Sequence, residues 1–353
     1  MQTNKFYRIA ATLVLGASML AVATPAFAAT LQVSNDSAKA SYETTILKAA
    51  DRLITLQNAN GSWDFDVTNA TGPTATTYYN VAGVSAQALL DAYSISHDAK
   101  YLTAAQLAGD YIVSGSATFA TARQNAFNAV FLFDLATASG NSTYSTTATT
   151  LVNTVLHADN YWSHNAGSNC DANGCTPLQL LGAYENYRGF PGSTDQAGIV
   201  PWDLMAFVQA TKASGDSATA AVIEQYIVAF VTDPAYTNSV GNYALGLSGA
   251  LRAAQIVGDT ASASTLTTIL TGTVGPNGEY GTAPEGQVQT TAYALLALQS
   301  VGSSNATAAA HYLGQNFGYS ALNGWKDTDG SEYAEIDSEA AHALASLMTS
   351  GTY

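Results

Sequence analysis

Alanine- and leucine-rich segments recur along the chain at a nearly constant spacing, and this repeat limits the fold more than any other feature. Six segments have helical periodicity and are apolar on nearly all sides, which is typical of helices buried by neighbours on both flanks. They cover residues 84–93, 126–135, 202–210, 243–252, 290–298 and 338–347. The first stops near residue 97, and the others stop at Gly140, Gly215, Gly258, Gly302 and Gly351. Because glycine is the favoured residue just past a helix end, these positions mark helix ends.

The separations between successive stops are 43, 75, 43, 44 and 49 residues, which predicts a repeat array. Six more segments with one apolar face alternate with the first set. They are Ser41–Gln57, Ala99–Val113, Ser142–His157, Ser217–Val231, Ser262–Leu270 and Ala306–Asn316. An open solenoid needs polar capping helices, and neither end of the array has one. We therefore predict an all-α fold, a closed α/α toroid of six helical hairpins with an inner and an outer ring, in one domain over residues 29–353.

One interval of the repeat is about thirty residues longer than the others, and the surplus forms a predicted inserted loop at about 158–199. It contains Cys170 and Cys175, separated by an Asp-Ala-Asn-Gly turn. In an oxidising compartment this spacing predicts a local disulfide. A redox pair normally has closer spacing, and a zinc site needs a second cysteine pair. Long loops inside compact domains often serve as lids or binding loops, and a surface loop without function is the alternative.

The N-terminus has the pattern of a secretory signal peptide over residues 1–28. Lys5 and Arg8 precede an apolar run from Ile9 to Val22, and an Ala-x-Ala site ends at Ala28. The run is too short for a membrane anchor. The pattern predicts a secreted or periplasmic protein whose first mature residue is Ala29. Losing two basic residues with the leader takes the formal net charge from −15 to −17.

Composition and charge exclude several classes of protein. With 47% hydrophobic and 10% charged residues, the chain is unlike an intrinsically disordered one. It carries 11 Lys and Arg against 26 Asp and Glu, with no basic cluster. Nucleic-acid binding requires Lys and Arg at the phosphates, so no nucleic-acid partner is expected. An anionic membrane surface is disfavoured for the same reason. No second apolar run is long enough to span a membrane.

The first hairpin contains Gln57, Gly61 and Trp63 in the order Gln-x3-Gly-x-Trp. This motif resembles the repeat of squalene cyclases, within the terpenoid cyclase and protein prenyltransferase-like α/α toroid superfamily, which also includes a family of pectate lyases. Degenerate copies lie at residues 278–280 and 324–325. The resemblance implies the toroid fold, in which the Gln and the Trp tie an outer helix to the next loop. It does not transfer chemistry.

The catalytic signatures of those relatives are missing. The protonating Asp-x-Asp-Asp run of the cyclases is absent, and both cysteines lie in the inserted loop rather than on an inner helix, as a prenyltransferase zinc site would require. The thioester motif is also absent. Polyuronate lyases use Arg or Lys with calcium, and the net charge repels a polyanion. We expect no metal and no cofactor. The acid spacing from Asp327 to Glu332 is that of a partial calcium loop, so calcium stays open as the alternative.

Loops from outer to inner helices gather at one end of a ring of hairpins, here called the rim. This rim is rich in acids and aromatics, which suit a sugar. The predicted catalytic candidates are Asp203, Glu335, Asp337, Asp64 and Glu285. The predicted substrate-binding residues are Trp63, Arg123, Trp202, Tyr280, Trp325 and Tyr333. Asp203 and Asp337 have a second interpretation as helix caps, and Asp64 as a solvated loop acid. His311 and His342 are interpreted as packed polar residues.

These patterns predict a secreted carbohydrate-active enzyme, a glycoside hydrolase or a polysaccharide lyase, with an oligosaccharide or polysaccharide as its partner. Two carboxylates would act as acid and as base or nucleophile. The first alternative is a non-catalytic toroid that binds ligand outside the cytoplasm. The second is a terpenoid cyclase-like enzyme, which follows only from the resemblance.

Overall fold

The structure, a computed structural model, describes residues 36–64, 66–67, 81–115, 122–156, 201–234, 243–281, 287–318, 323–327 and 330–348. In these ranges the chain forms helices and no strand; one isolated bridge pairs Asp66 with Tyr333. The helices are α1 (Asp36–Leu56), α2 (Val81–Ser96), α3 (Ala99–Val113), α4 (Ala122–Ser139), α5 (Ser142–Leu156), α8 (Pro201–Ala213), α9 (Ser217–Val231), α11 (Tyr243–Val257), α12 (Thr260–Thr271), α13 (Gln287–Gln299), α14 (Asn305–Asn316) and α15 (Ala334–Ala345). None of these helices is both long and apolar enough to cross a membrane.

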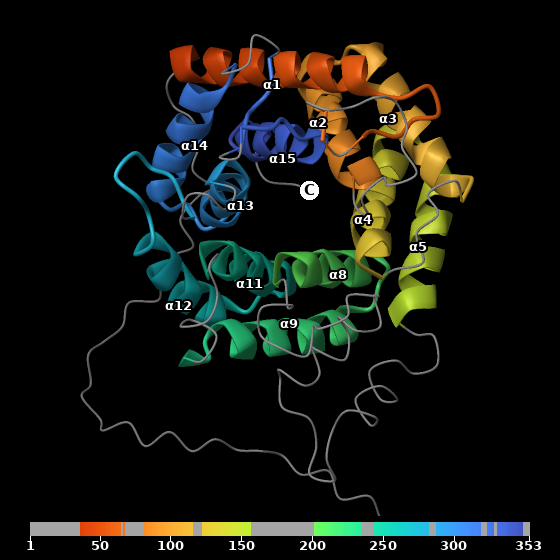
Figure 1. Cartoon of the computed structure of the whole chain (residues 1–353). Helices are drawn as coiled ribbons and strands as arrows, with labels where there is room; N and C mark the ends of the chain where they lie inside the picture. Colours follow the sequence, from red (N-terminus) through yellow and green to blue (C-terminus); the bar gives the residue numbers. More distant parts are fainter. Residues whose placement is uncertain are drawn as a thin grey trace, which may run out of the picture.

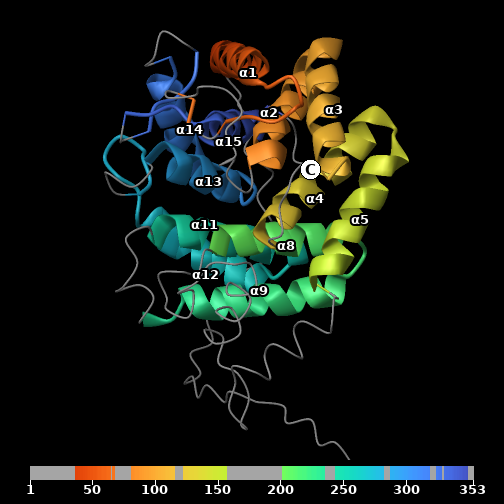
Figure 2. The same cartoon turned by 45° about the vertical axis from the view of Figure 1, so that its right-hand side comes forward.

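The helices form two concentric rings (Figures 1 and 2). The inner ring consists of α2, α4, α8, α11, α13 and α15, each in contact with the next, and α15 contacts α2, which closes the ring. The outer ring consists of α1, α3, α5, α9, α12 and α14, packed against the inner helices. The prediction of an α/α toroid with alternating outer and inner helices is therefore confirmed for the part of the chain that the structure describes.

Helix ends agree closely with the repeat read from the sequence. The bounds of α3 and α9 are those predicted, whereas α1 begins five residues earlier. The four described stop glycines have φ between 67° and 99°, and His97 takes the equivalent left-handed position with φ 56°. The signal peptide and the inserted loop with Cys170 and Cys175 lie outside the described residues.

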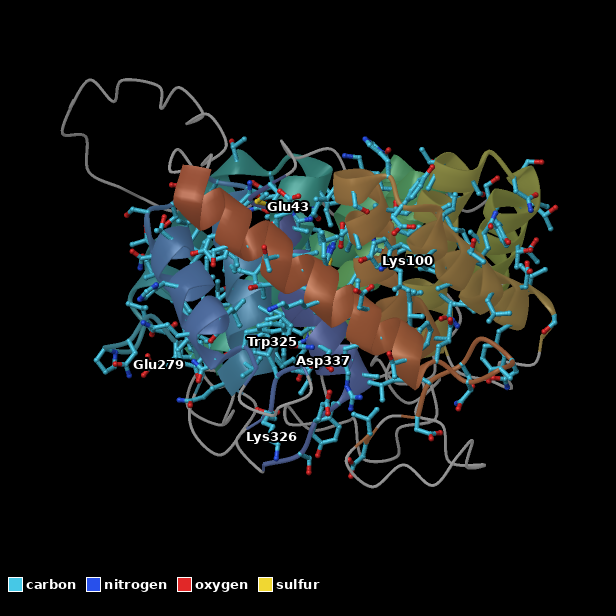
Figure 3. All side chains as sticks on the ribbon, turned by 90° about the horizontal axis from the view of Figure 1, so that it is seen from above. Glu43, Lys100, Glu279, Trp325, Lys326 and Asp337 are labelled. Carbon is cyan, nitrogen blue, oxygen red and sulfur yellow. The ribbon has the colours of Figure 1, made fainter. Side chains whose placement is uncertain are left out.

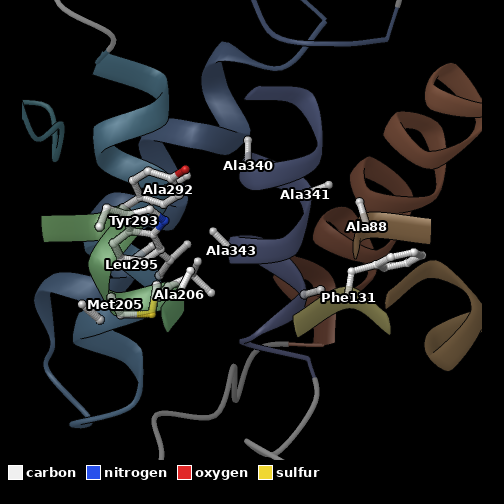
Figure 4. Packing of buried hydrophobic residues seen from close by; sticks show 14 of the residues in the cluster. Ala88, Phe131, Met205, Ala206, Ala292, Tyr293, Leu295, Ala340, Ala341 and Ala343 are labelled. Carbon is white, nitrogen blue, oxygen red and sulfur yellow. The ribbon is translucent and has the colours of Figure 1, made fainter. Parts of the chain in front are cut away.

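Small side chains allow the inner helices to pack closely. Figure 4 shows Ala341 on the side of α15 towards Ala88 of α2, and Ala343 on the side towards Leu295 of α13. All four are fully buried. Because α15 is covered on both flanks, alanine is the residue that lets two neighbours approach without a gap. This arrangement explains why the inner segments are apolar nearly all round.

The Gln-Gly-Trp motif is structural, as predicted. Gln57 Nε2 donates to the backbone oxygens of Gly61 (3.2 Å) and Ala104 (3.0 Å), which ties the first loop to α3. The Trp63 indole N–H donates to the backbone oxygen of Leu53 at 2.8 Å. The degenerate copy repeats this contact, since the Trp325 indole N–H donates to the Leu313 oxygen at 2.8 Å. Each loop is thus fixed to its own outer helix by a buried indole.

Gly61 is the least replaceable part of this motif. It has φ 93°, and a Cβ there would lie 2.2 Å from the backbone oxygen of Leu107. We predict that Gly61→Ala lowers the free energy of unfolding by roughly 3 kcal/mol or more, because left-handed strain adds to a clash with backbone that cannot move aside. Urea unfolding followed by circular dichroism measures the change.

Gly140→Ala is the matched control, since Gly140 has φ 71° and no heavy atom within 4 Å of the added Cβ. It should cost only the backbone strain, about 1–2 kcal/mol. Equal losses in the two variants would contradict the close packing of Gly61 on α3.

Candidate functional site

A cavity lies inside the inner ring and measures about 730 Å³, including the open space at its mouth. All six inner helices contribute to its wall. The lining residues are Gly83, Val84, Gln87, Phe127, Val130, Asp134, Trp202, Met205, Ala206, Gln209, Arg252, Tyr293, Leu296, Ser338, Glu339 and His342.

Helical periodicity explains which residues reach the cavity. Val84 and Gln87 of α2 are three residues apart, and Val130 and Asp134 of α4 are four apart, so each pair shares one helix face. The inner helices begin at the rim, and each residue advances about 1.5 Å along the axis. Arg252, nine residues after the start of α11, is therefore roughly 14 Å below the rim. Ionisable groups lie in the body of the ring as well as at its edge.

His342 and Asp91 form a pair across the junction between α15 and α2. His342 Nδ1 lies 2.7 Å from Asp91 Oδ2, and the Asp91 side chain is 1% exposed. The other carboxylate oxygen of Asp91 has no hydrogen-bond partner in the structure. Burial alone lowers the pKa of His342, but Asp91 and Asp134 outweigh burial and Arg252, so the His342 pKa is raised. His342 is thus held through Nδ1, and its side chain also lines the cavity.

Asp134 provides a carboxyl suited to proton donation. Burial raises its pKa to about 6, with a smaller contribution from Asp91 and against opposing effects of His342 and Gln87. Gln87 Nε2 donates to Asp134 Oδ2 at 3.1 Å, which links α2 to α4. A carboxyl with this pKa is partly protonated near neutral pH, as a general acid must be.

Glu339 supplies a second carboxylate to the same wall. It is 5% exposed, and Gln289 of α13 donates to its Oε2 at 2.9 Å. On the same wall, the rings of Trp202 and Tyr293 stack with centroids 3.7 Å apart and planes at 15°. The cavity therefore combines two carboxyls, a histidine and aromatic rings, a set that can bind a sugar and transfer protons.

Three of the predicted substrate-binding residues are part of the core. Trp63, Tyr280 and Trp325 have no exposed surface. Trp63 and Trp325 donate to outer-helix backbone, and the Tyr280 hydroxyl accepts from Asn305 Nδ2 at 3.4 Å. The structure corrects the expectation that their rings stack on a ligand, because the loops fold back on the outer helices and bury them. Trp202 lines the cavity, and its role in substrate binding stays a prediction.

Asp337 is also a structural residue rather than part of the cavity wall. Its side chain is buried, and its Oδ1 accepts from the Trp325 backbone N–H at 2.7 Å. Arg52 makes hydrogen bonds of 2.9 and 3.0 Å to Glu332, which neighbours Asp337. Figure 3 shows Asp337 beside Trp325, with Lys326 pointing away from the body of the protein. Asp337 is not the N-cap either, since α15 follows Tyr333.

The remaining predicted residues do not gather in the described part of the cavity. Glu335 is buried in the first turn of α15, and Tyr333 and Asp64 are half-buried. The side chains of Asp203 and Arg123, and the whole of Glu285, lie outside the described residues. No group of three or more acidic, His or Cys side chains in the described residues could hold a metal ion.

The sequence analysis missed the ionisable residues of the inner helices. Asp91, Asp134, Arg252 and Glu339 lie within the apolar segments, and His342 was interpreted as a packed residue. The signal was present: a charged residue in a helix that is apolar nearly all round must face a partner or a cavity, because burying it alone is costly.

Neither the known protein-family models nor the curated protein sequences contain a match to this chain. Solved structures do resemble it. The GH76A α-1,6-mannanase from Salegentibacter sp. HEL1_6 has a TM-score of 0.56 at 9% identity, covering 87% of this chain and 99% of that one. The unsaturated glucuronyl hydrolase from Bacillus sp. GL1 has a TM-score of 0.62 at 12% identity, covering 88% and 96%.

The type II terpene cyclase MstE from Scytonema is also similar, with a TM-score of 0.54 at 15% identity, covering 89% of this chain and 99% of that one. At these identities the likeness shows a shared fold. The chain has the α/α toroid architecture that these enzymes have, over nearly their whole length.

The His342–Asp91 pair makes a testable prediction. In Asp91→Asn the hydrogen bond to Nδ1 can persist, but the negative charge that favours the imidazolium is lost. We expect the pKa of His342 to fall below its ordinary value of 6.5. NMR titration of the imidazole signals measures it, with the exposed His97 and His311 as internal controls. An unchanged His342 pKa would refute the assigned role of Asp91.

The buried position of Asp337 gives a second prediction. Burial, together with Glu332, raises its pKa well above 3.8, against the Trp325 N–H and Arg52. The folded state therefore holds the proton, so the stability that Asp337 contributes is greatest at low pH and declines as the pH rises above about 4. Asp337→Asn removes this decline, because asparagine can accept from Trp325 and donate to Glu332. The stability of the variant relative to the native protein should increase with pH.

Urea unfolding at pH 5 and pH 8 tests this expectation. Asp98→Asn is the control, because Asp98 is an exposed N-cap and asparagine caps a helix equally well. A stability difference for Asp337→Asn that decreases with pH would show that this carboxyl is ionised in the folded protein.

Proposed function

We propose that this chain is a secreted glycoside hydrolase whose active site is the cavity of the inner ring. One observation carries the proposal: two carboxyls with different environments, Asp134 and Glu339, belong to the same cavity wall. Glycoside hydrolysis requires such a pair, with one carboxyl that donates a proton and one that stays ionised.

Asp134 takes the role of general acid. Its pKa of about 6 keeps a useful fraction protonated, and its Oδ2 is held by Gln87. In the reaction it would protonate the glycosidic oxygen as the bond to the leaving sugar breaks. The electron pair of that bond goes to the leaving oxygen, which departs as a hydroxyl group.

Glu339 takes the role of the second carboxylate. The hydrogen bond from Gln289 Nε2 to its Oε2 fixes the direction of the carboxyl group. It would either activate a water molecule or attack the anomeric carbon, and the separation of the two carboxyls in the substrate complex decides between these routes. His342, held by Asp91, lies on the same wall and would contribute a hydrogen-bonding group for sugar hydroxyls.

The comparisons support this proposal at the level of fold and ligand class. The mannanase has been solved as an inactive variant with α-1,6-mannotriose, and the glucuronyl hydrolase is named for degrading glycosaminoglycan. The terpene cyclase shares the fold and has been solved with geranylgeranyl dihydroxybenzoate, a substrate with a long hydrocarbon chain. The cavity here holds several ionisable side chains, which favour a polar ligand. A non-catalytic toroid remains the outcome if no glycan is cleaved.

A polysaccharide panel with reducing-end detection, run with and without chelator, tests the proposal. Asp134→Asn and Glu339→Gln should each lose about 10²-fold or more in kcat, since the amides keep the shape and remove proton transfer or charge. Glu43→Gln on the outer helix α1 is the matched control and should keep full activity. Full activity in both cavity variants would exclude the site, and no activity on any glycan would favour the binding toroid.

The pH dependence of kcat/KM gives an independent prediction. If Asp134 is the general acid, only its protonated form reacts, so kcat/KM should fall as the pH rises through about 6. A constant kcat/KM between pH 5 and pH 8 would contradict this role.

A further inference from the structure

Arg252 is a cation in the cavity wall that no carboxylate of the described residues neutralises. Its Nη1 donates to the neutral Gln255 Oε1 at 3.3 Å, one turn along the same helix. Burial lowers the pKa of the guanidinium to about 10, and no acidic group opposes this effect. The side chain is therefore still charged at neutral pH, and among the described residues no acidic group stabilises that charge.

The two carboxyls that line the cavity, and Asp91 behind His342, have other partners. Asp91 pairs with His342, Asp134 accepts from Gln87, and Glu339 accepts from Gln289. Arg52, by contrast, has two hydrogen bonds to Glu332. Among the described residues, the half-buried Arg52 thus has an acidic partner, whereas Arg252 in the cavity wall has none.

We propose that Arg252 binds the carboxylate of an acidic sugar, so that the substrate is a glycan containing uronate residues. This inference rests on the proposed function and deepens it. A guanidinium presents a planar pair of N–H groups that match a carboxylate, and the pairing is strong in a site that excludes water. A sugar carboxylate would supply the counter-charge that Arg252 lacks in the described structure.

The net charge of the protein restricts how many acid groups the substrate can carry. The formal net charge of −15 repels a polyanion at long range. A ligand with one acid group among neutral sugars meets much less repulsion than a polyuronate, yet still places one carboxylate on Arg252. We therefore expect a mostly neutral glycan that carries single uronate residues.

The test compares two ligands that differ in a single group. One is a set of aldobiouronic acids, each with one glucuronate or galacturonate linked to a neutral hexose. The other is the same set after carboxyl reduction, in which the carboxylate has become a hydroxymethyl group. Isothermal titration calorimetry on the native protein should give at least about tenfold tighter binding of an acid form than of its reduced form.

Arg252→Gln should remove this preference, and Arg252→Lys should keep part of it, because lysine retains the charge but not the planar pair of donors. Lys48→Gln is the matched control: it removes the same charge from the exposed surface of α1 and should keep the full preference. Circular dichroism checks the fold of each variant. If the Arg252 variants do not fold, the test is the salt dependence of ligand binding to the native protein. Binding of the acid forms should weaken as the salt concentration increases, and binding of the reduced forms should not.

The outcomes separate the two proposals. If neutral glycans are cleaved in an Asp134-dependent way but acid and reduced ligands bind equally, the role of Arg252 is wrong and the proposed hydrolase stands. An unchanged preference in a folded Arg252→Gln variant also overturns the role of Arg252. If neither form binds and no glycan is cleaved, both proposals fail.

Discussion

The contact between the last and the first inner helix holds the toroid closed. Ser338 of α15 donates to the backbone oxygen of Val84 in α2 and accepts from the Ala88 N–H at 3.2 Å. One turn further, His342 pairs with Asp91, 251 residues away in the sequence. Without this contact the inner helices would form an open arc, and the cavity would have no complete wall.

The closure also sets the chemistry of the cavity. A complete wall keeps bulk water from the side chains within it, and burial is the main cause of the raised pKa of Asp134. Two of the residues that close the ring, Ser338 and His342, also line the cavity. Stability and the electrostatics of the site therefore depend on the same helix pair.

The rim residues that the structure describes mainly hold the fold together, although their composition predicted ligand binding. Trp63 and Trp325 bind their loops to outer helices, and Asp337 binds the loop of Trp325 to the inner helix α15. This fixes the starting points of the inner helices, and hence the faces that they present to the cavity. The ionisable groups that line the cavity lie further inside, on inner-helix residues at helical spacing.

The sequence alone determined the architecture. The repeat spacing, the glycine stops and the absence of capping helices specify six hairpins in a closed ring, because each of these signals is local or periodic and can be read without knowing which helices meet. The Gln-Gly-Trp motif was interpreted correctly as structural for the same reason. Helix bounds agree to within a few residues at most ends.

The candidate site was decided by tertiary structure. Whether Asp134 or Asp337 faces the cavity depends on the rotation of each inner helix against its two neighbours, and a helix that is apolar all round gives no sequence signal for that rotation. Trp63 and Trp202 look alike in sequence, yet one is buried against its own helix and the other lines the cavity. The pairing of His342 with Asp91 exists only after the ring has closed, since no local pattern joins residues so far apart.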